Sequence, residues 1–499
     1  MSQITQRDIE IIVESVMKNV ERSMEGKSSN VSVKALPHQG KPSATKSQLG
    51  VFQNAEDAIL AAHQAYLEYS SNYRLEDRRN IVEAIRQVAL THLDELAQLT
   101  YEETNIGRLE DKKSKIFLAA TKTPGTEDLT TSAISGDYGL TIEERAPFGV
   151  IGVVTPVTNP VETIINNSIS MLAAGNAVVY NVHPSSKSCT SKLVNLINQQ
   201  IQLVNGPANL ITMIANPTLE SLDVIMNCPK VALLVGTGGP RMVKTLLQSG
   251  KKAIGAGAGN PPVIVDETAD IEAAAKAIIE GTAFDNNILC IGEKEVFCLS
   301  QVYDNLIYHM LKNKAYFLSK EEINKIKEIV LTQHEVEAAK GCSLTEKKKE
   351  YHVSKDWVGK DAQLILKAIG VNKKDINLLI FEAEFEDPFV QLEQMMPILP
   401  IVKVKTFEEA VQLAVKAEHG NRHTASIFSK NIDRMTQFAR AIQTTIFVKN
   451  AATLAGVGYK GEGHTTFTIA GPTGEGVTSA KTFTRIRRCT LAEGGFRIM

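Results

Sequence analysis

Apolar side chains first recur at helical spacing between residues 7 and 20, with charged residues on the opposite side. This pattern predicts a short amphipathic helix, whose apolar stripe consists of Ile9, Ile12, Val13, Val16 and Val20. The chain then turns to Ser, Lys, Gly and Pro, a composition typical of a flexible linker. We assign residues 1–22 to the helix and 23–48 to the linker. The tethered helix is expected either to dock on the body of the protein or to enter a groove on another protein.

The body of the chain, after Val51, alternates between helical and strand patterns. Residues 55–103 carry apolar positions at helical spacing, and residues 130–147 alternate around two glycines, which predicts a hairpin arm. Three units of strand, turn and helix follow between residues 149 and 250, and this repetition predicts a parallel sheet flanked by helices. A second α/β segment continues to about residue 449. Within it we interpret the Lys-rich stretch 345–357 as a solvated loop.

Length and charge narrow the class of protein. A chain of 499 residues is expected to form two to four domains of about 100 to 200 residues each. Its 54 basic and 56 acidic side chains leave a net charge of −2, without the positive field that nucleic-acid binding needs. No apolar run approaches the roughly 18 residues that span a bilayer, and acidic residues interrupt the N-terminal stretch where a signal peptide is apolar. We therefore expect a soluble, cytoplasmic protein with no nucleic-acid or membrane partner.

The six cysteines form no CxxC pair and no spacing typical of metal ligands, so we expect neither a disulfide framework nor a metal. Cys290 lies beside asparagines at a predicted helix-to-strand junction, where backbone N–H groups can favour the nucleophilic thiolate. The alternative is a cysteine packed as a small apolar side chain, an interpretation that suits Cys298 within the next strand.

A glycine turn is the best candidate for a nucleotide site. Gly236, Thr237 and Gly238 follow an apolar strand and precede a helix, whose N-terminus offers N–H groups to a phosphate. The spacing differs from GxGxxG, and such a turn serves ordinary packing about as often.

Several separated stretches together resemble the aldehyde dehydrogenase superfamily over roughly residues 50–499. The segment that carries the oxyanion-hole asparagine is similar to PFGVIGVVTPVTNP, the strand beside the adenosine to LAAGNAVVYNVHP, and the acidic ribose contact to EQMMPILPIV. Within the superfamily, long strings such as GAGNPPVIVD and GEGHTTFTIAGPTGEGVTSAKTFTRIRRC resemble the CoA-acylating propionaldehyde or acetaldehyde dehydrogenases of bacterial microcompartments.

The resemblance implies a set of site residues. It makes Cys290 the nucleophile, Asn159 the oxyanion donor and Glu393 the contact to the nicotinamide ribose. It places the remaining cofactor contacts at Thr155, Pro156, Val157, His183, Gly236, Thr237, Gly238, Gly255 and Gly257.

Two departures from the hydrolytic relatives bear on the chemistry. Gly255 stands where those enzymes carry the glutamate that activates water, and losing a positioned general base typically costs about 10²- to 10⁴-fold in rate. A small residue there leaves room for the thiol of CoA, which attacks without a strong base. His183 replaces a lysine that contacts the adenosine ribose; it takes over part of that role or serves only to cap its loop.

The fold implied by the resemblance is α/β and aldehyde-dehydrogenase-like. A Rossmann-type cofactor domain comprises residues 49–124 and 145–254, a catalytic domain 255–479, and a β-hairpin oligomerisation arm 125–144 and 480–499. The expected partners are a short-chain aldehyde, CoA, copies of this chain in a dimer or tetramer, and a microcompartment shell protein bound through residues 1–22.

The implied reaction is reversible oxidation of a short-chain aldehyde, propionaldehyde first and acetaldehyde next, to acyl-CoA. It uses NAD and CoA, no metal, and a thioester on Cys290. Three alternatives stay open at this point: a hydrolytic aldehyde dehydrogenase, a non-catalytic scaffold or cargo protein, and an enzyme working mainly as a reductase of acyl-CoA. The sequence does not separate NAD from NADP.

Overall fold

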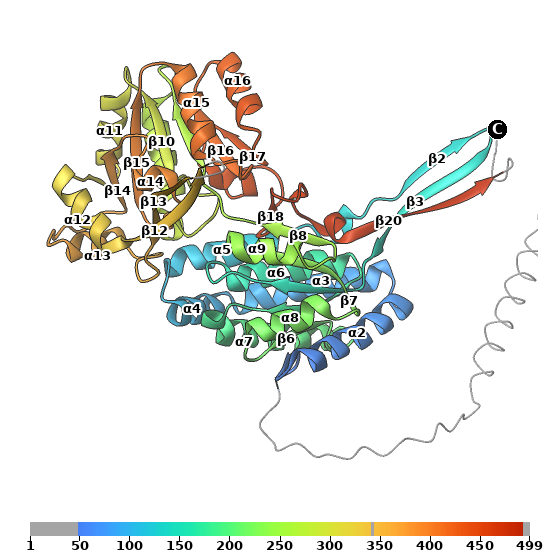
Figure 1. The fold of residues 1–499 in the computed structure, drawn as a ribbon. Helices are drawn as coiled ribbons and strands as arrows, with labels where there is room; N and C mark the ends of the chain where they lie inside the picture. Colours follow the sequence, from blue (N-terminus) through green and yellow to red (C-terminus); the bar gives the residue numbers. More distant parts are fainter. Residues whose placement is uncertain (1–47, 341–343, 493–499) are drawn as a thin grey trace, which may run out of the picture. The chain divides into compact units, whose positions relative to one another are not determined.

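The computed structural model describes residues 48–340 and 344–492, so the expected targeting helix and most of its linker lie outside the described residues. Two parallel sheets and an antiparallel arm organise the rest (Figure 1). The first sheet has the strand order β1-β6-β5-β4-β7-β8. Its strands are β1 (Val51–Phe52), β4 (Val150–Val154), β5 (Ala177–Asn181), β6 (Ile211–Ile214), β7 (Val231–Thr237) and β8 (Ala253–Ala256).

Helices cover both faces of the first sheet. α2 packs on β5 and β6 and lies beside α8, which packs on β7, whereas α6 and α7 pack on the other side with α3, α4 and α5 outside them. The bounds are α2 (Ala55–Asn72), α3 (Leu75–Thr91), α4 (Leu93–Thr104), α5 (Leu109–Lys122), α6 (Pro160–Ala173), α7 (Lys187–Leu203), α8 (Leu219–Asn227) and α9 (Pro240–Leu247). Because both faces are covered, the central strands are mostly apolar, and β5 is buried along its whole length.

The strand order reverses in the middle of this sheet. The chain runs outward from β4 through β5 to β6, then crosses to the other side of β4 to form β7 and β8. In open α/β sheets, ligands bind at the carboxyl ends of the strands at such a switch point. The loops after β4 and β7 therefore face the expected crevice.

The second sheet is parallel as well, with the order β11-β14-β15-β10-β9-β16-β17. Its strands are β9 (Pro262–Val265), β10 (Glu295–Leu299), β11 (Ala315–Phe317), β14 (Leu378–Glu382), β15 (Ile398–Val404), β16 (Thr424–Phe428) and β17 (Ile446–Lys449). Its helices are α10 (Ile271–Ala283), α11 (Tyr303–Lys312), α12 (Lys320–Val330), α13 (Ala362–Ala368), α14 (Pro388–Gln391), α15 (Phe407–Ala417) and α16 (Ile432–Ile442). The two-sheet α/β architecture expected from the sequence is confirmed.

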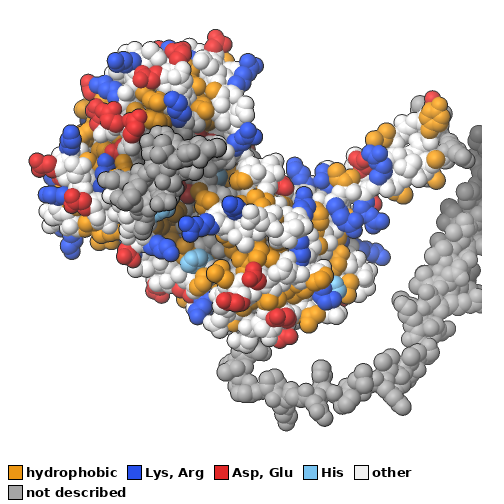
Figure 2. Space-filling model, viewed as in Figure 1, with side chains coloured by type: hydrophobic (Ala, Val, Ile, Leu, Met, Phe, Trp, Pro, Cys, Tyr) orange, Lys and Arg blue, Asp and Glu red, His pale blue; other side chains and the backbone are white. Residues whose placement is uncertain are grey.

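The expected hairpin arm is present. β2 (Ser132–Gly136) and β3 (Gly139–Pro147) form the hairpin, and β20 (Thr484–Ala492) adds a third antiparallel strand beside β3. The arm extends away from the two parallel sheets (Figure 1). Apolar and basic side chains are exposed along it (Figure 2).

One interpretation of the sequence is wrong. The Lys-rich stretch read as a solvated loop forms most of β13 (Leu344–Val353), which pairs with β12 (Leu331–Lys340) in an antiparallel ladder. A backbone ladder needs no apolar side chains, so the composition of one strand does not reveal a partner that precedes it in the chain.

The remaining elements are short. They are β18 (Ile469–Ala470), β19 (Gly476–Val477), and the 3-10 helices η1 (Thr126–Asp128), η2 (Pro184–Ser186), η3 (Phe284–Asn287), η4 (Thr453–Val457) and η5 (Ala480–Phe483).

Candidate active site

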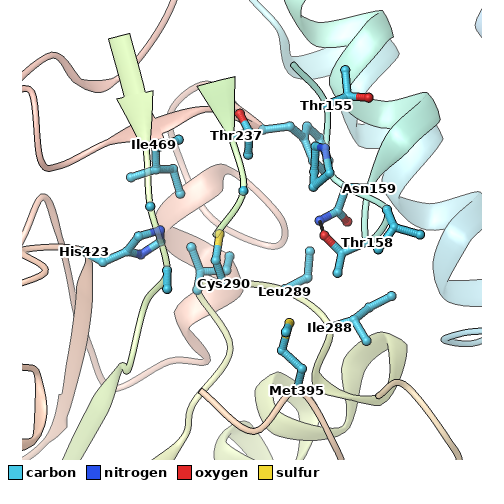
Figure 3. Close-up of a pocket in the computed structure, with 18 of the residues that line it drawn as sticks. Thr155, Thr158, Asn159, Thr237, Ile288, Leu289, Cys290, Met395, His423 and Ile469 are labelled. Carbon is cyan, nitrogen blue, oxygen red and sulfur yellow. Dashed lines mark hydrogen bonds between the residues drawn. The ribbon is translucent and has the colours of Figure 1, made fainter. Parts of the chain in front are cut away.

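A cavity of about 480 Å³ lies at the carboxyl ends of β4, β7 and β8, at the switch point of the first sheet. The loops after these strands supply one part of its wall, and segments of the second sheet supply the other. Figure 3 shows Cys290 and Asn159 reaching this cavity from different elements. The structure thus brings together the nucleophile and the oxyanion donor expected from the sequence.

Cys290 follows an unusual turn. Asp285, Asn286 and Asn287 have φ values of 46°, 54° and 64°, the left-handed region that non-glycine residues rarely adopt. Side-chain hydrogen bonds hold this backbone: Asn286 Nδ2 donates to the Gly359 carbonyl at 2.9 Å, and Asn287 Nδ2 to the Glu293 carbonyl at 2.9 Å. The loop that presents the thiol is therefore fixed by its neighbours on both sides.

A buried ammonium group completes the support of this loop. Lys294 is fully buried, and its Nζ donates to the carbonyl oxygens of Asn287 at 3.0 Å and Leu289 at 3.1 Å. It also donates to the Asn287 side-chain oxygen. Burial lowers the pKa of Lys294, although neighbouring acids, first among them Glu393, oppose that shift. The ammonium therefore braces the carbonyl groups just before Cys290.

The thiol of Cys290 is protonated in the resting site. Its surroundings raise the pKa of Cys290 to about 12, first through burial and then through the carboxylate of Glu393. Lys294 and the backbone N–H groups of Cys290 and Ile291 act in the opposite direction but do not outweigh burial. The backbone donors favour the thiolate, as the sequence predicts, but the low polarity of the wall penalises the charge more strongly.

Asn159 is placed by the start of α6. It is the N-cap of this helix, Pro160 follows at the first helical position, and the entire helix is buried. The side-chain oxygen of Asn159 accepts a hydrogen bond from Lys115 Nζ at 2.7 Å, and its Nδ2 donates to Thr158 Oγ1 at 3.2 Å. Because an ammonium only donates, the amide oxygen must face Lys115. The second hydrogen of Nδ2 therefore remains available for a ligand.

Gly259 lies between Glu393, the Cys290 loop and His423. Its N–H donates to Glu393 Oε1 at 3.3 Å. A Cβ at this position would lie 2.5 Å from the Cys290 carbonyl oxygen and 3.0 Å from His423 Cγ. Only a glycine permits this close approach.

His423 is a site residue that the sequence reasoning missed. Its Nδ1 pairs with Thr424 Oγ1 at 2.9 Å, whereas its buried Nε2 has no hydrogen-bond partner among the described residues. Burial, assisted by Lys294, lowers the pKa of His423 to about 4, so the imidazole is neutral at pH 7. It lies on the wall of the cavity near Cys290 (Figure 3). No local pattern in the sequence marks it, since it precedes an ordinary buried strand.

Most of the expected cofactor residues line the cavity, although their roles stay predictions. These wall residues are Thr155, Pro156, Val157, His183, Thr237, Gly238, Gly257 and Glu393. His183 also caps η2, because its Nδ1 accepts from the Ser185 N–H at 3.2 Å. Burial, together with the charge of Lys355, lowers the pKa of His183.

Gly236 and Gly255 are not among the wall residues, and their expected contacts with the cofactor stay predictions. A Cβ at Gly236 would lie 2.2 Å from Leu246 Cδ1, and one at Gly255 would lie 2.6 Å from Val243 Cγ1. Leu246 and Val243 belong to α9. Both glycines therefore allow α9 to pack closely on β7 and β8.

Two further observations concern the described part of the chain. No cluster of three or more His, Cys, Asp or Glu side chains suited to a metal ion occurs within it. Among residues 48–340 and 344–492, none of the helices combines the length and apolar character of a membrane span.

Comparison with known proteins identifies the class. The chain belongs to the aldehyde dehydrogenase family, whose sequence profile matches residues 25–471. Acetaldehyde dehydrogenase (acetylating) EutE of Salmonella typhimurium is 42% identical over 498 residues, covering 99% of this chain and 100% of that protein. Propanal dehydrogenase (CoA-propanoylating) of the same organism is 46% identical over 447 residues, covering 89% of this chain and 92% of that protein.

Solved structures agree with these relatives. A propionaldehyde dehydrogenase from the Clostridium phytofermentans fucose utilisation bacterial microcompartment superposes with a TM-score of 0.85 at 46% identity, covering 90% of this chain and 100% of that chain. A Rhodopseudomonas palustris propionaldehyde dehydrogenase with bound CoA and an acylated cysteine gives a TM-score of 0.84 at 47% identity, covering 89% and 98%. The aldehyde-dehydrogenase-like fold expected from the sequence is confirmed.

Proposed function

We propose that this protein oxidises a short-chain aldehyde, with NAD and CoA, to acyl-CoA and NADH through a thioester on Cys290. One observation carries the proposal: the Cys290 thiol and the Asn159 amide lie on the wall of one cavity at the switch point of the cofactor sheet. Relatives of 42% and 46% identity are an acetylating and a CoA-propanoylating aldehyde dehydrogenase.

In the first chemical step the Cys290 thiol loses its proton to solvent, and the resulting thiolate sulfur forms a bond to the carbonyl carbon of the aldehyde as the carbonyl π bond opens. Negative charge then gathers on the former carbonyl oxygen, where the Asn159 amide and the Cys290 backbone N–H are the expected donors. Each donor of this kind is worth about 3 kcal/mol in the transition state. An oxidised nicotinamide, when bound, would supply a positive charge that favours the thiolate and would accept a hydride from the aldehyde carbon.

The second half of the reaction transfers the acyl group. The sulfur of CoA attacks the thioester carbon, the bond from that carbon to Cys290 Sγ breaks, and Cys290 returns as a thiolate. The proton of the CoA thiol leaves to solvent, and the neutral Nε2 of His423 can carry it from the cavity. Since one thioester is exchanged for another, the reaction is expected to run in both directions.

The wall residues suit a dinucleotide. The turn Thr237–Gly239 precedes α9, and a Cβ at Gly239 would meet nothing within 4 Å, so a phosphate group can approach the backbone there. The buried hydroxyl oxygen of Thr155 has no partner among the described residues and can pair with a ligand. Glu393 is the single carboxylate among the described wall residues, in keeping with a ribose contact.

The wall also favours transfer to CoA over hydrolysis. Ala256, Gly257 and Ala258 line it where hydrolytic relatives carry the segment with the water-activating glutamate. Without a carboxylate in this segment to activate it, water attacks a thioester slowly, whereas a thiolate needs no strong base. Free acid is therefore expected to be a minor product.

The test of this function is NADH formation, followed by absorbance, from propionaldehyde and NAD with and without CoA. Sustained turnover should require CoA, and acyl-CoA should accumulate in equal amount to NADH. Acetaldehyde and NADP serve as comparison substrates; we expect propionaldehyde and NAD to give the higher kcat/KM. Equal turnover without CoA, with propionate as product, would identify a hydrolytic enzyme instead.

The proposal extends to location and assembly. The relative from Clostridium phytofermentans belongs to a bacterial microcompartment. We place this enzyme inside such a compartment, with residues 1–22 binding a shell protein by their apolar stripe and the arm forming a dimer or tetramer. Deleting residues 1–20 should leave kcat unchanged in dilute solution but abolish co-purification with shell proteins. Loss of soluble, active enzyme on this deletion would show instead that the segment supports the body.

A further inference from the structure

The mechanism leaves a buried cluster of four charged side chains unused. Lys112 and Lys115 on α5, Glu162 on α6 and Asp285 on η3 are each 0% or 1% exposed. The cluster holds two lysines and two acids, and burying so many ionisable groups is costly unless they are paired and hydrogen-bonded. The cluster lies directly behind Asn159 and the turn that precedes Cys290.

Lys115 is the member that connects the two sides of the site. Its Nζ donates to Asn159 Oδ1 at 2.7 Å and to the Thr158 carbonyl at 3.4 Å. The same nitrogen forms an ion pair with Asp285 Oδ2 and lies 3.5 Å from Glu162 Oε1. Lys115 therefore contacts both sides of the site. On the side of the first sheet it binds Asn159, the expected oxyanion donor. On the side of the second it binds Asp285, in the left-handed turn five residues before Cys290.

Asp285 connects Lys115 to the loop that carries Cys290. Its Oδ1 accepts from the Arg108 N–H at 2.6 Å, and its own N–H donates to Asp111 Oδ2 at 2.9 Å. Burial opposes the charge of Lys115, but Asp285 and Glu162 hold the pKa of Lys115 above its usual value. The ammonium therefore stays charged at neutral pH and remains a donor only.

We infer that Lys115 is a positioning residue, which turns the Asn159 amide so that Nδ2 faces the oxyanion and fixes its distance from the Cys290 loop. The inference rests on the proposed function, because it assigns Asn159 the role of oxyanion donor. A donor must point at the place where charge develops, and an amide rotated by 180° would present its oxygen there instead. Lys115 excludes that orientation.

The test compares Lys115→Met with Lys112→Met. Lys112 lies on the same helix, is equally buried, and approaches Asp285 Oδ2 to 3.5 Å, but its Nζ has no hydrogen-bond partner among the described residues. Both substitutions should lower the melting temperature. Lys115→Met should also lower kcat by about 10- to 10³-fold, with KM for NAD changed less than about threefold, whereas Lys112→Met should retain kcat.

A double-variant cycle separates positioning from general damage. If Lys115 acts through Asn159, adding Lys115→Met to Asn159→Ala should lower kcat no further than about threefold, because the group being positioned is already absent. The inference would be overturned if the kcat losses of Lys115→Met and Asn159→Ala multiply in the double variant. An unchanged kcat in Lys115→Met, or an equal loss of kcat in Lys112→Met, would overturn it as well. If Lys115→Met does not fold, the double variant Lys115→Met/Glu162→Gln keeps the cluster neutral and is measured by the same criteria.

The proposed function and this inference fail in different ways. Absence of CoA-dependent NADH formation by the unaltered protein, or full kcat in Asn159→Ala, would reject the proposed function or its oxyanion donor. If the unaltered protein forms NADH in a CoA-dependent way and Asn159→Ala loses kcat as expected, an unchanged kcat in Lys115→Met would reject the positioning role alone.

Discussion

At the scale of single residues, Cys290 in its loop and Cys298 in the following strand have contrasting environments. Cys290 lines the cavity, whereas Cys298 is fully buried inside β10 and shares no wall with it. Cys290→Ala should therefore abolish turnover. Cys298→Ala should retain most activity and cost stability through a small cavity. Steady-state kinetics and thermal unfolding of both variants check this, and equal losses of kcat in two folded proteins would contradict the assignment.

Gly259 offers a second prediction at this scale. A methyl group there would lie 2.5 Å from the Cys290 carbonyl oxygen, so Gly259→Ala must displace the nucleophile loop or the His423 ring. A displacement of about 1 Å at a reacting group can cost about 10²-fold in rate, and we expect a loss of kcat near that size. Gly136→Ala, where the added methyl meets nothing within 4 Å, is the matched control. Unchanged kcat in Gly259→Ala would show that the loop tolerates the shift.

At the scale of elements, the packing of α9 on β8 changes what a base at position 255 would do. A Cβ there points at Val243 rather than into the cavity, so Gly255→Glu should wedge α9 away from the sheet. We expect a loss of about 1 to 3 kcal/mol in stability, a lower CoA-dependent rate and little new acid formation. Thermal unfolding and propionate analysis test this. An unaltered melting temperature with substantial CoA-independent propionate would show that the carboxylate reaches the thioester.

The arm supports a prediction about assembly. Ile134, Tyr138 and Ile486 are 61%, 91% and 59% exposed on β2, the hairpin turn and β20, and exposed apolar side chains gathered on one element are typical of an interaction surface. If they meet a second copy, Ile486→Glu should shift the protein to smaller species in light scattering after size-exclusion chromatography. Leu203→Glu, at a 75% exposed position at the end of α7, should not. Identical masses for both variants and the unaltered protein would remove the arm from the interface.

Some elements were readable from the sequence, and the reasons are physical. β4, β5 and β7 are apolar runs that end in turns, because parallel strands covered on both faces must be apolar. β13 was not readable, since its ladder depends on a partner strand rather than on its own composition. Lys115 was missed for a similar reason. A lysine among charged residues on a helix predicts a solvated surface, and its burial comes only from packing against α6 and η3.

At the scale of the whole molecule, the site exists because two sheets meet. The sequence and its resemblance to a family pointed to Asn159 and Cys290 separately, and the strand order places the loops of both at one cavity. Gly259, His423 and Lys115 join those loops through contacts between residues distant in the chain. No local pattern encodes such contacts, so this part of the site required the structure.

The central claim is that the acyl group forms a thioester on Cys290 that persists until CoA attacks it. Intact-protein mass spectrometry after mixing the enzyme with propionaldehyde and NAD, without CoA, tests it most directly. We predict a mass increase of one propionyl group, located on the Cys290 peptide, absent in Cys290→Ala, and removed with release of propionyl-CoA when CoA is added. An unmodified protein that still yields NADH, or an acyl group that CoA does not remove, would contradict the account.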